Sequence, residues 1–386
     1  MKKHVSNLFF EKYGHNASKT YFSPGRVNII GEHTDYNGGL VMPFCIDKGL
    51  YAAVGRNNRN EINIYSENFS ILGIITVDLN DISYELNKNF SDYLLGVMKE
   101  IYDKGKLLNY GLDIVLSSNL PVGGGLSSSA ALSILLLSVF NYEFGLGFGK
   151  LDIVKMAKSV ENNFLGVKCG IMDQFVIGFG RENTALLLDT KSLKYEYLLI
   201  DFNEVNFVLI NSNTTRKLKE SKYNERQAET KEVLTIINRT FDYEYLTDIS
   251  MSDLSKVIEV VDSEVLRKRL THVVKENNRV KLAKEMILNK KFDELGKLLT
   301  EAHYSLKDDY EVSTPVLDEL VEIALKSGAL GARMIGGGFG GSTINLVLKK
   351  DLDGFIKKFK DSYEGKYENS FLYSIVYAKD GFKRID

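Results

Sequence analysis

Residues 120–131 combine residue types that suit the binding of a phosphate group. Their sequence is LPVGGGLSSSAA, and the apolar run AALSILLLSVF that overlaps its end is typical of a buried helix. Glycines let a backbone come close to a ligand, and serines supply hydroxyl groups and cap helices. The start of the helix adds unpaired N–H groups and the positive end of its dipole. The pattern slightly favours a phosphate-binding loop over a plain glycine turn with a serine cap.

The same loop is not a Walker A motif, because no GxxxxGK[ST] pattern occurs and no lysine follows the glycines. A nucleotide bound here would need a metal ion to neutralise much of its charge. Mg²⁺ binds hard oxygen ligands and keeps part of its water shell. We therefore expect a serine hydroxyl at the helix start and a carboxylate from another part of the chain as its ligands.

A polar loop, EHTDYNGG at residues 32–39, lies between the strand patterns YFSPGRVNII and LVMPFCI. It brings Glu32, His33 and Asp35 within a few residues of Arg26. Each residue alone would be an ordinary polar surface residue. Together, two carboxylates, an imidazole and a guanidinium are costly to gather without a polar ligand. Loops placed in this way commonly carry function, and these four groups could exchange hydrogen bonds with several neighbouring hydroxyl groups.

Two more acidic residues stand among apolar ones. Asp173 follows Ile171 and Met172 in the segment GVKCGIMDQFVIGFG, where an acidic residue is either a helix cap or a functional group. The sequence leaves these two alternatives evenly balanced. Glu161 lies in LDIVKMAKSVENNFLG, whose apolar residues recur at helical spacing. That spacing alone predicts an exposed Glu161.

The composition is that of a globular protein without a nucleic-acid or membrane partner. The chain has 386 residues, 44% hydrophobic content and a net charge of -2 from 49 basic and 51 acidic residues. This length supports a sizeable core in two domains, and the balanced charge offers no basic patch for nucleic acid or an anionic membrane. The longest apolar run is too short to span a bilayer, and residues 1–14 do not resemble a signal peptide. With two distant cysteines, Cys45 and Cys169, these features predict a cytoplasmic location.

The expected elements fall into two groups. An amphipathic helix in residues 1–19 and alternating strand patterns precede the phosphate-binding candidate, and a helix and a β-hairpin come after its own helix. From residue 215 to residue 327 the pattern is mostly that of long, charged amphipathic helices. The segment SGALGARMIGGGFGGSTINLVL then contains a formal GxGxxG pattern. A strand follows these glycines instead of a helix, so we predict a strand–glycine turn–strand unit and no dinucleotide site.

Three stretches, SPGRVNIIGEHTDYNGG, LPVGGGLSSSAA and GGGFGGSTINLV, resemble in order the three motifs of the GHMP small-molecule kinases. The first is closely similar to the galactokinase signature of that family. The segments CGIMDQF and NSNTTRKLKESKYNERQ also resemble galactokinase segments, so the resemblance covers nearly the whole chain. One departure is Asn224-Glu225-Arg226, where the family often has consecutive arginines. We expect these side chains to lie outside the pocket.

The resemblance implies an α+β, two-domain GHMP kinase fold with the active site in the cleft between the domains. Residues 1–200 would form an N-terminal, ribosomal-S5-domain-2-like layer structure that carries the sugar-binding loop, the phosphate loop and the catalytic aspartate. Residues 201–386 would form a ferredoxin-like α+β domain whose third glycine-rich motif supports the phosphate loop across the cleft. A final strand and helix in residues 373–386 would return to either domain.

The resemblance also implies a role for each matching residue. Asp173 matches the catalytic aspartate that faces the anomeric hydroxyl of a sugar, and Arg26 matches the arginine that stabilises the transferring phosphoryl group. The implied sugar ligands are Glu32, His33, Thr34, Asp35, Gly170 and Tyr223. The implied ATP contacts are Ser66, Gly123, Gly124, Gly125, Leu126, Ser127, Ser128 and Ser129. Ser129 and Glu161 match the magnesium ligands, which meets the expectation of a serine and a carboxylate.

The implied activity is Mg-ATP-dependent phosphorylation of D-galactose at the C1 hydroxyl, the first committed step of galactose use by the Leloir pathway. A kinase for N-acetylgalactosamine or another sugar stays open, because the room near C2 cannot be judged from the sequence. A homoserine or mevalonate kinase is disfavoured, since it would not need the polyol-binding loop. A non-catalytic sugar sensor is disfavoured because the serine-alanine run and Asp173 are intact. The expected state is a monomer or weak oligomer.

Overall fold

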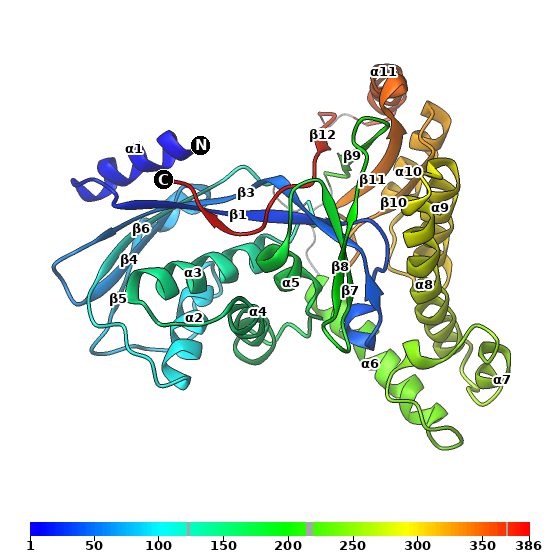
Figure 1. Cartoon of the computed structure of the whole chain (residues 1–386), viewed down its shortest axis with the longest axis horizontal. Coiled ribbons are helices and arrows are strands. Elements are labelled where there is room, and N and C mark those ends of the chain that lie inside the picture. Colours follow the sequence, from blue (N-terminus) through cyan, green and yellow to red (C-terminus); the bar gives the residue numbers. More distant parts are fainter. Residues whose placement is uncertain (122–123, 214–218, 368–369) are drawn as a thin grey trace.

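The computed structural model describes residues 1–121, 124–213, 219–367 and 370–386. Figure 1 shows two α+β halves side by side, one around a long sheet beside the N-terminus and one in which helices and strands of the C-terminal half stack together. Among the helices of the described residues, none is both long enough and apolar enough to cross a membrane.

A six-stranded sheet forms the centre of the N-terminal half, with the strand order β13-β1-β3-β6-β4-β5. β4 and β6 are parallel, and the other neighbouring strands are antiparallel. The parallel pair requires a crossover, which helix α2 supplies. The strands are β1 (Lys19–Asn28), β3 (Pro43–Arg56), β4 (Glu61–Ser66), β5 (Ile74–Asp78), β6 (Leu112–Ser118) and β13 (Lys383–Arg384).

Helices cover both faces of this sheet (Figure 1). α1 (Lys2–Tyr13) packs on β3 and β6 from one side, and α3 (Ser128–Phe144) and α5 (Met172–Phe179) pack on β1 and β3 from the other. α2 (Ser91–Asp103) and α4 (Lys150–Ser159) complete the second layer by packing on α3. α3 is buried along most of its length, which confirms the predicted buried helix after the phosphate loop.

A small three-stranded sheet, β2-β7-β8, fixes the end of the polar loop. β2 (Leu40–Val41) directly follows that loop and pairs with β7 (Thr184–Asp189). β7 and β8 (Tyr195–Leu199) form the predicted hairpin. Short 3-10 turns lie at Asp35–Asn37, Glu67–Leu72, Leu246–Asp248 and Lys349–Asp351.

The C-terminal half has an antiparallel four-stranded sheet with the order β10-β11-β9-β12. Its strands are β9 (Val205–Asn211), β10 (Gly331–Met334), β11 (Ser342–Leu348) and β12 (Tyr373–Val376). Its helices are α6 (Lys219–Ile237), α7 (Leu254–Ile258), α8 (Glu264–Leu288), α9 (Phe292–Asp308), α10 (Pro315–Ser327) and α11 (Leu352–Glu364). The βαββαβ order of this sheet is that of the predicted ferredoxin-like domain. β10 and β11 also confirm the predicted strand–glycine turn–strand unit.

The largest hydrophobic cluster of the described residues joins the two halves. It contains Phe44 of β3 and Phe207 of β9, whose ring centroids are 5.5 Å apart. Helices α8 and α9 contribute Val280 and Leu298 to the same cluster. An apolar interface of this kind holds two domains in a fixed arrangement. The expected boundary at residue 200 stays a prediction, because this core extends across it.

The segment 373–386 belongs to both halves. β12 pairs with β9 in the C-terminal sheet, whereas β13 pairs with β1 in the N-terminal sheet. The helix predicted for this segment is wrong. Its backbone groups bind neighbouring segments instead, as in the bonds from Phe382 N to the Ile177 carbonyl oxygen (2.8 Å) and from Ile385 N to the Thr20 carbonyl oxygen (2.9 Å).

Candidate active site

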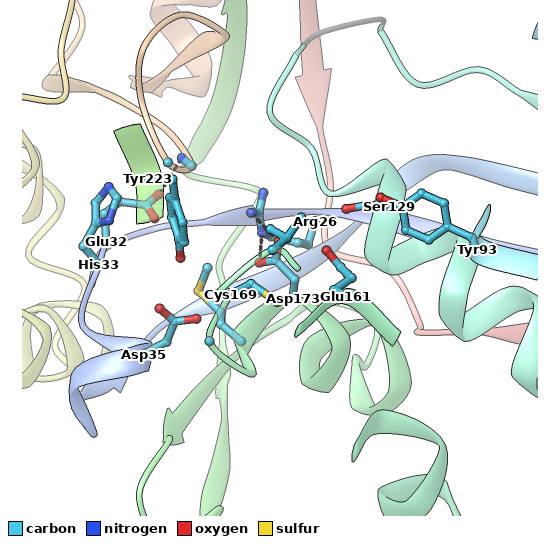
Figure 2. A pocket seen from close by; sticks show the side chains of 15 residues that line it. Arg26, Glu32, His33, Asp35, Tyr93, Ser129, Glu161, Cys169, Asp173 and Tyr223 are labelled. Atoms are coloured by element: carbon cyan, nitrogen blue, oxygen red, sulfur yellow. Dashed lines mark hydrogen bonds and ion pairs between the residues drawn. The ribbon is translucent and has the colours of Figure 1, made fainter. Parts of the chain in front are cut away.

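Two adjoining pockets lie where the polar loop, the phosphate loop and helix α5 meet. Arg26, Ser129 and Asp173 line both pockets and form a shared wall. The first pocket is also lined by Glu32, His33, Asp35, Tyr93, Glu161, Val167, Cys169, Gly170, Met172, Tyr223, Gly336 and Gly337. The second is also lined by Leu120, Pro121, Gly124, Gly125, Leu126, Ser127 and Ser128. In Figure 2 the Arg26–Asp173 pair separates a group of four residues, Glu32, His33, Asp35 and Tyr223, from Ser129, Glu161 and Tyr93.

Arg26 and Asp173 form a bidentate ion pair in the shared wall. Arg26 Nε lies 2.6 Å from Asp173 Oδ1, and Nη2 lies 2.8 Å from Oδ2. The third nitrogen, Nη1, donates to the Gly125 carbonyl oxygen at 2.7 Å. The pairing of β1 with β3 shifts register between Pro24 and Arg26, an irregularity of the kind that redirects side chains near functional sites. The pair places a positive charge and a carboxylate at the junction of the two pockets.

The phosphate loop reaches this carboxylate through Ser127. Gly125 and Ser127 have φ angles of 76° and 59°, a left-handed conformation that glycine adopts readily and serine rarely. The Ser127 hydroxyl donates to Asp173 Oδ2. Ser127 stands at the N-cap position of α3 but makes no side-chain cap hydrogen bond within the described residues. Ser127 therefore does not cap the helix with its side chain, because its hydroxyl binds the Asp173 carboxylate instead of the helix N–H groups.

Glu161 lies in a π-helical turn, Val160–Phe164, that continues helix α4. Its side chain is 5% exposed, so the exposure predicted from helical spacing is wrong. A π turn adds a residue to the helix and rotates the side chains that follow, and such turns are frequent at functional sites. Gln174 Nε2 donates to Glu161 Oε1 at 2.8 Å. Burial raises the pKa of Glu161 to about 7, and the nearby Asp173 carboxylate adds to this rise.

Ser129 and Glu161 together fit the oxygen ligands of a magnesium ion. The Ser129 hydroxyl lies near the Glu161 carboxylate and counteracts part of the rise in its pKa, and both residues line the first pocket. A buried carboxylate near another acidic group is stabilised by a bound cation. Within the described residues, no group of three or more His, Cys, Asp or Glu is arranged to hold a metal. Two protein oxygens are sufficient for Mg²⁺, which takes its other ligands from water and phosphate groups.

Asp35 and Gly170 meet at the other end of the first pocket. Asp35 begins a 3-10 turn, and the backbone N–H of Met172 lies near its carboxylate and opposes part of the rise in its pKa. A Cβ atom at Gly170 would overlap Asp35 Oδ2, so glycine leaves the space that this carboxylate occupies. Burial raises the pKa of Asp35 to about 7, and the Asp173 carboxylate adds to this rise. Asp35 is thus a well-placed acceptor for a hydroxyl group of a ligand.

His33 and Tyr223 line the same end with their rings. His33 has a φ of 63°, which is uncommon for a residue other than glycine. Its Nδ1 lies 2.8 Å from the Tyr36 hydroxyl, which lies 2.8 Å from the Tyr310 hydroxyl. The ring centroids of His33 and Tyr223 are 5.5 Å apart. Because Tyr223 comes from α6 and Tyr310 follows α9, both halves of the chain build this end of the pocket.

Glu32 faces the pocket from the boundary between the halves. Its Oε1 accepts hydrogen bonds from Arg333 Nη1 at 3.1 Å and from Gly336 N at 2.9 Å. A Cβ atom at Gly336 would lie 3.3 Å from the Gly125 carbonyl oxygen. The third glycine-rich stretch therefore touches both the polar loop and the phosphate loop.

Three predicted ligands lie off the pocket walls or outside the described residues. Thr34 is fully buried, and its hydroxyl lies 2.9 Å from the Gly31 carbonyl oxygen and 2.7 Å from that of Leu40. Ser66 is 5% exposed at the end of β4 and lines neither pocket in the described part of the chain. Gly123 lies outside the described residues. The roles of these three residues as ligands stay predictions.

Sequence reasoning missed several pocket residues: Tyr93, Val167, Cys169, Met172 and Gly337. Cys169 and Met172 flank predicted residues, so their position alone could have indicated them. Arg333 carries a clearer signal, because it is a charged residue in a strand whose four residues are all buried. Asn224, Glu225 and Arg226 line neither of the two pockets of the described chain, as expected.

Three segments match known family descriptions. Residues 7–56 match the galactokinase galactose-binding signature, residues 92–181 the GHMP kinases N terminal domain, and residues 282–365 the GHMP kinases C terminal. A galactokinase from Bacillus subtilis (strain 168) is 41% identical over 368 residues, which is 95% of this chain and 94% of that protein. The chain belongs to the galactokinase family.

Other members of the galactokinase family agree with this assignment over nearly the whole chain. The galactokinase from Clostridium tetani (strain Massachusetts / E88) is 42% identical over 357 residues, 92% of this chain and 90% of that protein. The crystal structure of Lactococcus lactis galactokinase complexed with galactose has a TM-score of 0.95 and 36% identity, with 99% of both chains covered. Methanococcus jannaschii mevalonate kinase shares the fold, with a TM-score of 0.67 and 20% identity. The predicted GHMP kinase fold is confirmed.

Proposed function

We propose that this chain transfers the γ-phosphoryl group of ATP to the C1 hydroxyl of D-galactose and releases galactose 1-phosphate and ADP. The observation that carries the proposal is the wall shared by the two pockets, formed by Arg26, Ser129 and Asp173. A hydroxyl group in the first pocket and a phosphate group in the second would meet at this wall. Membership of the galactokinase family supports the choice of ATP and galactose.

Phosphoryl transfer depends on positioning and charge stabilisation more than on covalent chemistry. Arg26 stabilises negative charge on the transferring group and orients Asp173 through the bidentate pair. Asp173 orients the sugar hydroxyl and accepts its proton. Because a carboxylate is a weak base for a sugar hydroxyl, the proton moves late, while the bond to the leaving ADP is already breaking.

The phosphate side is built from backbone and metal ligands. N–H groups at the start of α3 bind phosphate oxygens, and the helix dipole favours their negative charge. Ser129 and Glu161 hold Mg²⁺, and Gln174 keeps the Glu161 carboxylate in place. When bound, Mg²⁺ neutralises part of the phosphate charge.

The sugar side explains how the enzyme selects among sugars. The Glu32 and Asp35 carboxylates accept hydrogen bonds from the sugar hydroxyls, assisted by His33 and Tyr223. An epimer that leaves a buried carboxylate without its donor is rejected more strongly than a sugar with extra apolar bulk. Thr34 holds the backbone of the loop in this scheme, since its hydroxyl binds carbonyl oxygens.

The proposal extends to the setting of the enzyme. ATP and D-galactose are its small-molecule partners, and the product opens galactose use by the Leloir pathway. The enzyme works in the cytoplasm, which the sequence composition and the two distant cysteines support. Its expected state is a monomer or weak oligomer.

ADP release by the purified protein with Mg-ATP tests this function across galactose, N-acetylgalactosamine, glucose, arabinose, homoserine and mevalonate. We expect fast turnover on galactose alone. Faster turnover on N-acetylgalactosamine or another sugar would keep the mechanism and replace the substrate. Binding of galactose and ATP without turnover on any compound would contradict the proposal and favour a non-catalytic sensor.

A further inference from the structure

Arg333 of β10 is a fully buried cation held by four hydrogen bonds. Nε donates to the Ile29 carbonyl oxygen at 2.8 Å, and Nη2 donates to that of Asn28. Nη1 donates to Glu32 Oε1 at 3.1 Å and to the Met334 carbonyl oxygen at 2.7 Å. Three of these acceptors lie in the N-terminal half, within five residues of one another. A buried guanidinium is tolerated when its donors are paired in this way.

The guanidinium fixes the direction of the Glu32 side chain. Within the described residues, Glu32 is the acidic residue that pairs with Arg333. The planar fork of an arginine orients its acceptors, whereas a lysine acts as a point charge. Because the other donors of the fork are anchored on the end of β1, the position of Nη1 next to Glu32 is set by the backbone.

Both groups that reach the Glu32 carboxylate from the C-terminal half bind the same oxygen. Arg333 Nη1 and Gly336 N both donate to Oε1, the latter at 2.9 Å. Oε2 is therefore the oxygen that can accept a hydroxyl group in the first pocket, which Glu32 lines (Figure 2).

The backbone at Glu32 is held by a different element, helix α8. Glu276 Oε1 accepts hydrogen bonds from Gly31 N at 2.8 Å and from Glu32 N at 3.2 Å. His272 Nε2 lies 3.2 Å from the Glu32 carbonyl oxygen. Arg279 Nε in turn donates to Glu276 Oε2 at 2.7 Å. When Arg333 is changed, the backbone at Gly31 and Glu32 keeps these contacts to α8. The Glu32 carboxylate loses the guanidinium and keeps the weaker, neutral donor Gly336 N.

We propose that Arg333 is a positioning residue for sugar binding, which holds Glu32 Oε1 so that Oε2 meets a hydroxyl group of the sugar. This inference rests on the proposed function, since it assigns the first pocket to the sugar. Among the hydrogen bonds of Arg333 in the described part of the chain, none reaches the shared wall of Arg26, Ser129 and Asp173. ATP binding and phosphoryl transfer therefore do not depend on it directly.

Arg333→Lys tests the inference, because lysine keeps the charge and loses the fork. The assay uses the sugar that the wild-type protein phosphorylates fastest. We expect its KM, and its Kd measured by calorimetry without nucleotide, to rise about tenfold or more. The KM for ATP should stay within about twofold and kcat within about threefold of the wild type. If R333K cannot be purified, Arg333→Gln carries the same prediction.

Arg269→Lys is the matched control for the loss of a buried guanidinium. Arg269 is 1% exposed and binds the Asp309 carbonyl oxygen and the carboxylates of Glu229 and Glu311. None of these partners lines either pocket in the described chain. R269K should lower the midpoint of thermal unfolding and change the sugar Kd much less than R333K does, because Arg269 faces the sugar pocket through the ring of Tyr310, whose centroid lies 6.0 Å from its guanidinium carbon. An equal loss of sugar affinity in R269K and R333K would reduce Arg333 to a general stabilising role and overturn the inference.

The variant Glu32→Gln tests whether Arg333 affects sugar binding by positioning Glu32 or by stabilising the fold in general. If Arg333 acts through Glu32, R333K should weaken sugar binding much less in an E32Q background than in the wild type. Equal losses in the two backgrounds, or an unchanged sugar Kd in R333K beside a binding wild type, would overturn the inference and leave the proposed function intact. A wild type that binds no sugar would overturn both.

Discussion

At the sugar end of the site the ligand candidates are held by side chains from both halves of the chain, whereas the phosphate end is held largely by the N-terminal half. The carboxylate of Glu32 is bound from β10 and the glycine stretch after it, and its backbone is bound from α8. At the phosphate end, Arg26 N donates to the Leu126 carbonyl oxygen at 3.1 Å, and Gly124 N donates to that of Pro121 at 3.2 Å.

The difference follows from the ligands. Sugar hydroxyls are uncharged, so they are recognised by directional acceptors whose positions must be fixed by buried contacts. Phosphate groups carry charge and are bound by backbone N–H groups, a helix dipole and a cation. We therefore expect distant substitutions to change sugar affinity, and changes in the loop and metal ligands to act on the nucleotide.

A substitution in the shared wall should give the largest effect, because it should lower turnover while leaving sugar binding almost unchanged. Asp173→Asn keeps the shape of the side chain and removes the proton acceptor. We expect kcat to fall by about a thousandfold or more, as for the loss of a general base. The Kd of galactose should change by about threefold at most, because in the proposed mechanism Asp173 would contact no sugar group other than the reacting hydroxyl. Steady-state ADP release and calorimetry measure the two quantities, and wild-type-like turnover would remove Asp173 from its role.

Glu161→Gln should act on the phosphate end without touching the sugar end. The Mg²⁺ concentration for half-maximal activity should rise about tenfold or more, since a ligand carboxylate is lost. The Kd of galactose without nucleotide should not change. Glu143→Gln is the control, because Glu143 pairs with Lys19 and Tyr21, and none of these three residues lines either pocket in the described chain. An equal shift in the Mg²⁺ requirement of E143Q would contradict the assignment of Glu161.

Gly170→Ala should act on the sugar end alone. The new methyl group would overlap Asp35 Oδ2 and displace the carboxylate. We expect the KM for galactose to rise about tenfold, with the KM for ATP unchanged. Gly354→Ala in helix α11 is the control, because a Cβ atom there meets no atom within 4 Å. A variant G170A with wild-type sugar affinity would show that the Asp35 carboxylate is not needed in its present position.

The pH dependence of sugar binding should be the smallest effect. Because burial raises the pKa of Asp35 to about 7, its carboxyl group is largely protonated below that pH. Galactose affinity without nucleotide should therefore fall a few-fold, roughly, as pH drops from about 8 to about 6. Asp35→Asn should remove this dependence, whereas Glu161→Gln should keep it. Calorimetry between about pH 6 and about pH 8 measures the galactose Kd of the wild type and of both variants. A wild-type Kd that does not change with pH would contradict the prediction.

The Asp35 carboxyl group should also make the stability of the protein depend on pH. Galactose affinity should rise with pH, whereas the contribution of Asp35 to the free energy of unfolding should fall. Its pKa is raised in the folded protein, so between about pH 4 and pH 7 the native state binds more protons than the unfolded state. The contribution of Asp35 to the free energy of unfolding should therefore decrease as pH rises through this range. Denaturant titrations of the wild type and D35N should differ most near neutral pH, and parallel pH profiles would contradict this.

The two ends also differed in how far the sequence predicted them. The glycines and serines of the phosphate loop and the buried helix after them were recognised from local pattern, because a turn and a helix start leave their signature in neighbouring residues. The polar loop could be proposed as a site for the same reason. The predicted two-domain fold with a ferredoxin-like half was also correct, although the ferredoxin-like topology was implied by the resemblance and not by the patterns.

Other features could not be predicted because they depend on contacts between distant segments. Spacing predicted an exposed Glu161, since a π turn has no recognisable sequence pattern. The role of Ser127 depends on Asp173, which lies forty-six positions away in sequence. Arg333 and Glu32 are about three hundred residues apart, and their pairing requires the C-terminal sheet to pack on the polar loop. The helix expected in 373–386 was wrong because two separate sheets determine the conformation of that segment.

The return of β13 to the N-terminal sheet has a consequence for synthesis. Strand β1 receives its second neighbour from Lys383 and Arg384, and Thr20 N donates to Asp386 Oδ1 at 2.9 Å. On the ribosome, the edge of β1 at Tyr21 and Phe22 therefore stays open until residues 383–386 have been translated. Open edges invite pairing with other chains. This part of β1 is thus open to association with neighbouring nascent chains until the segment 383–386 has paired with it.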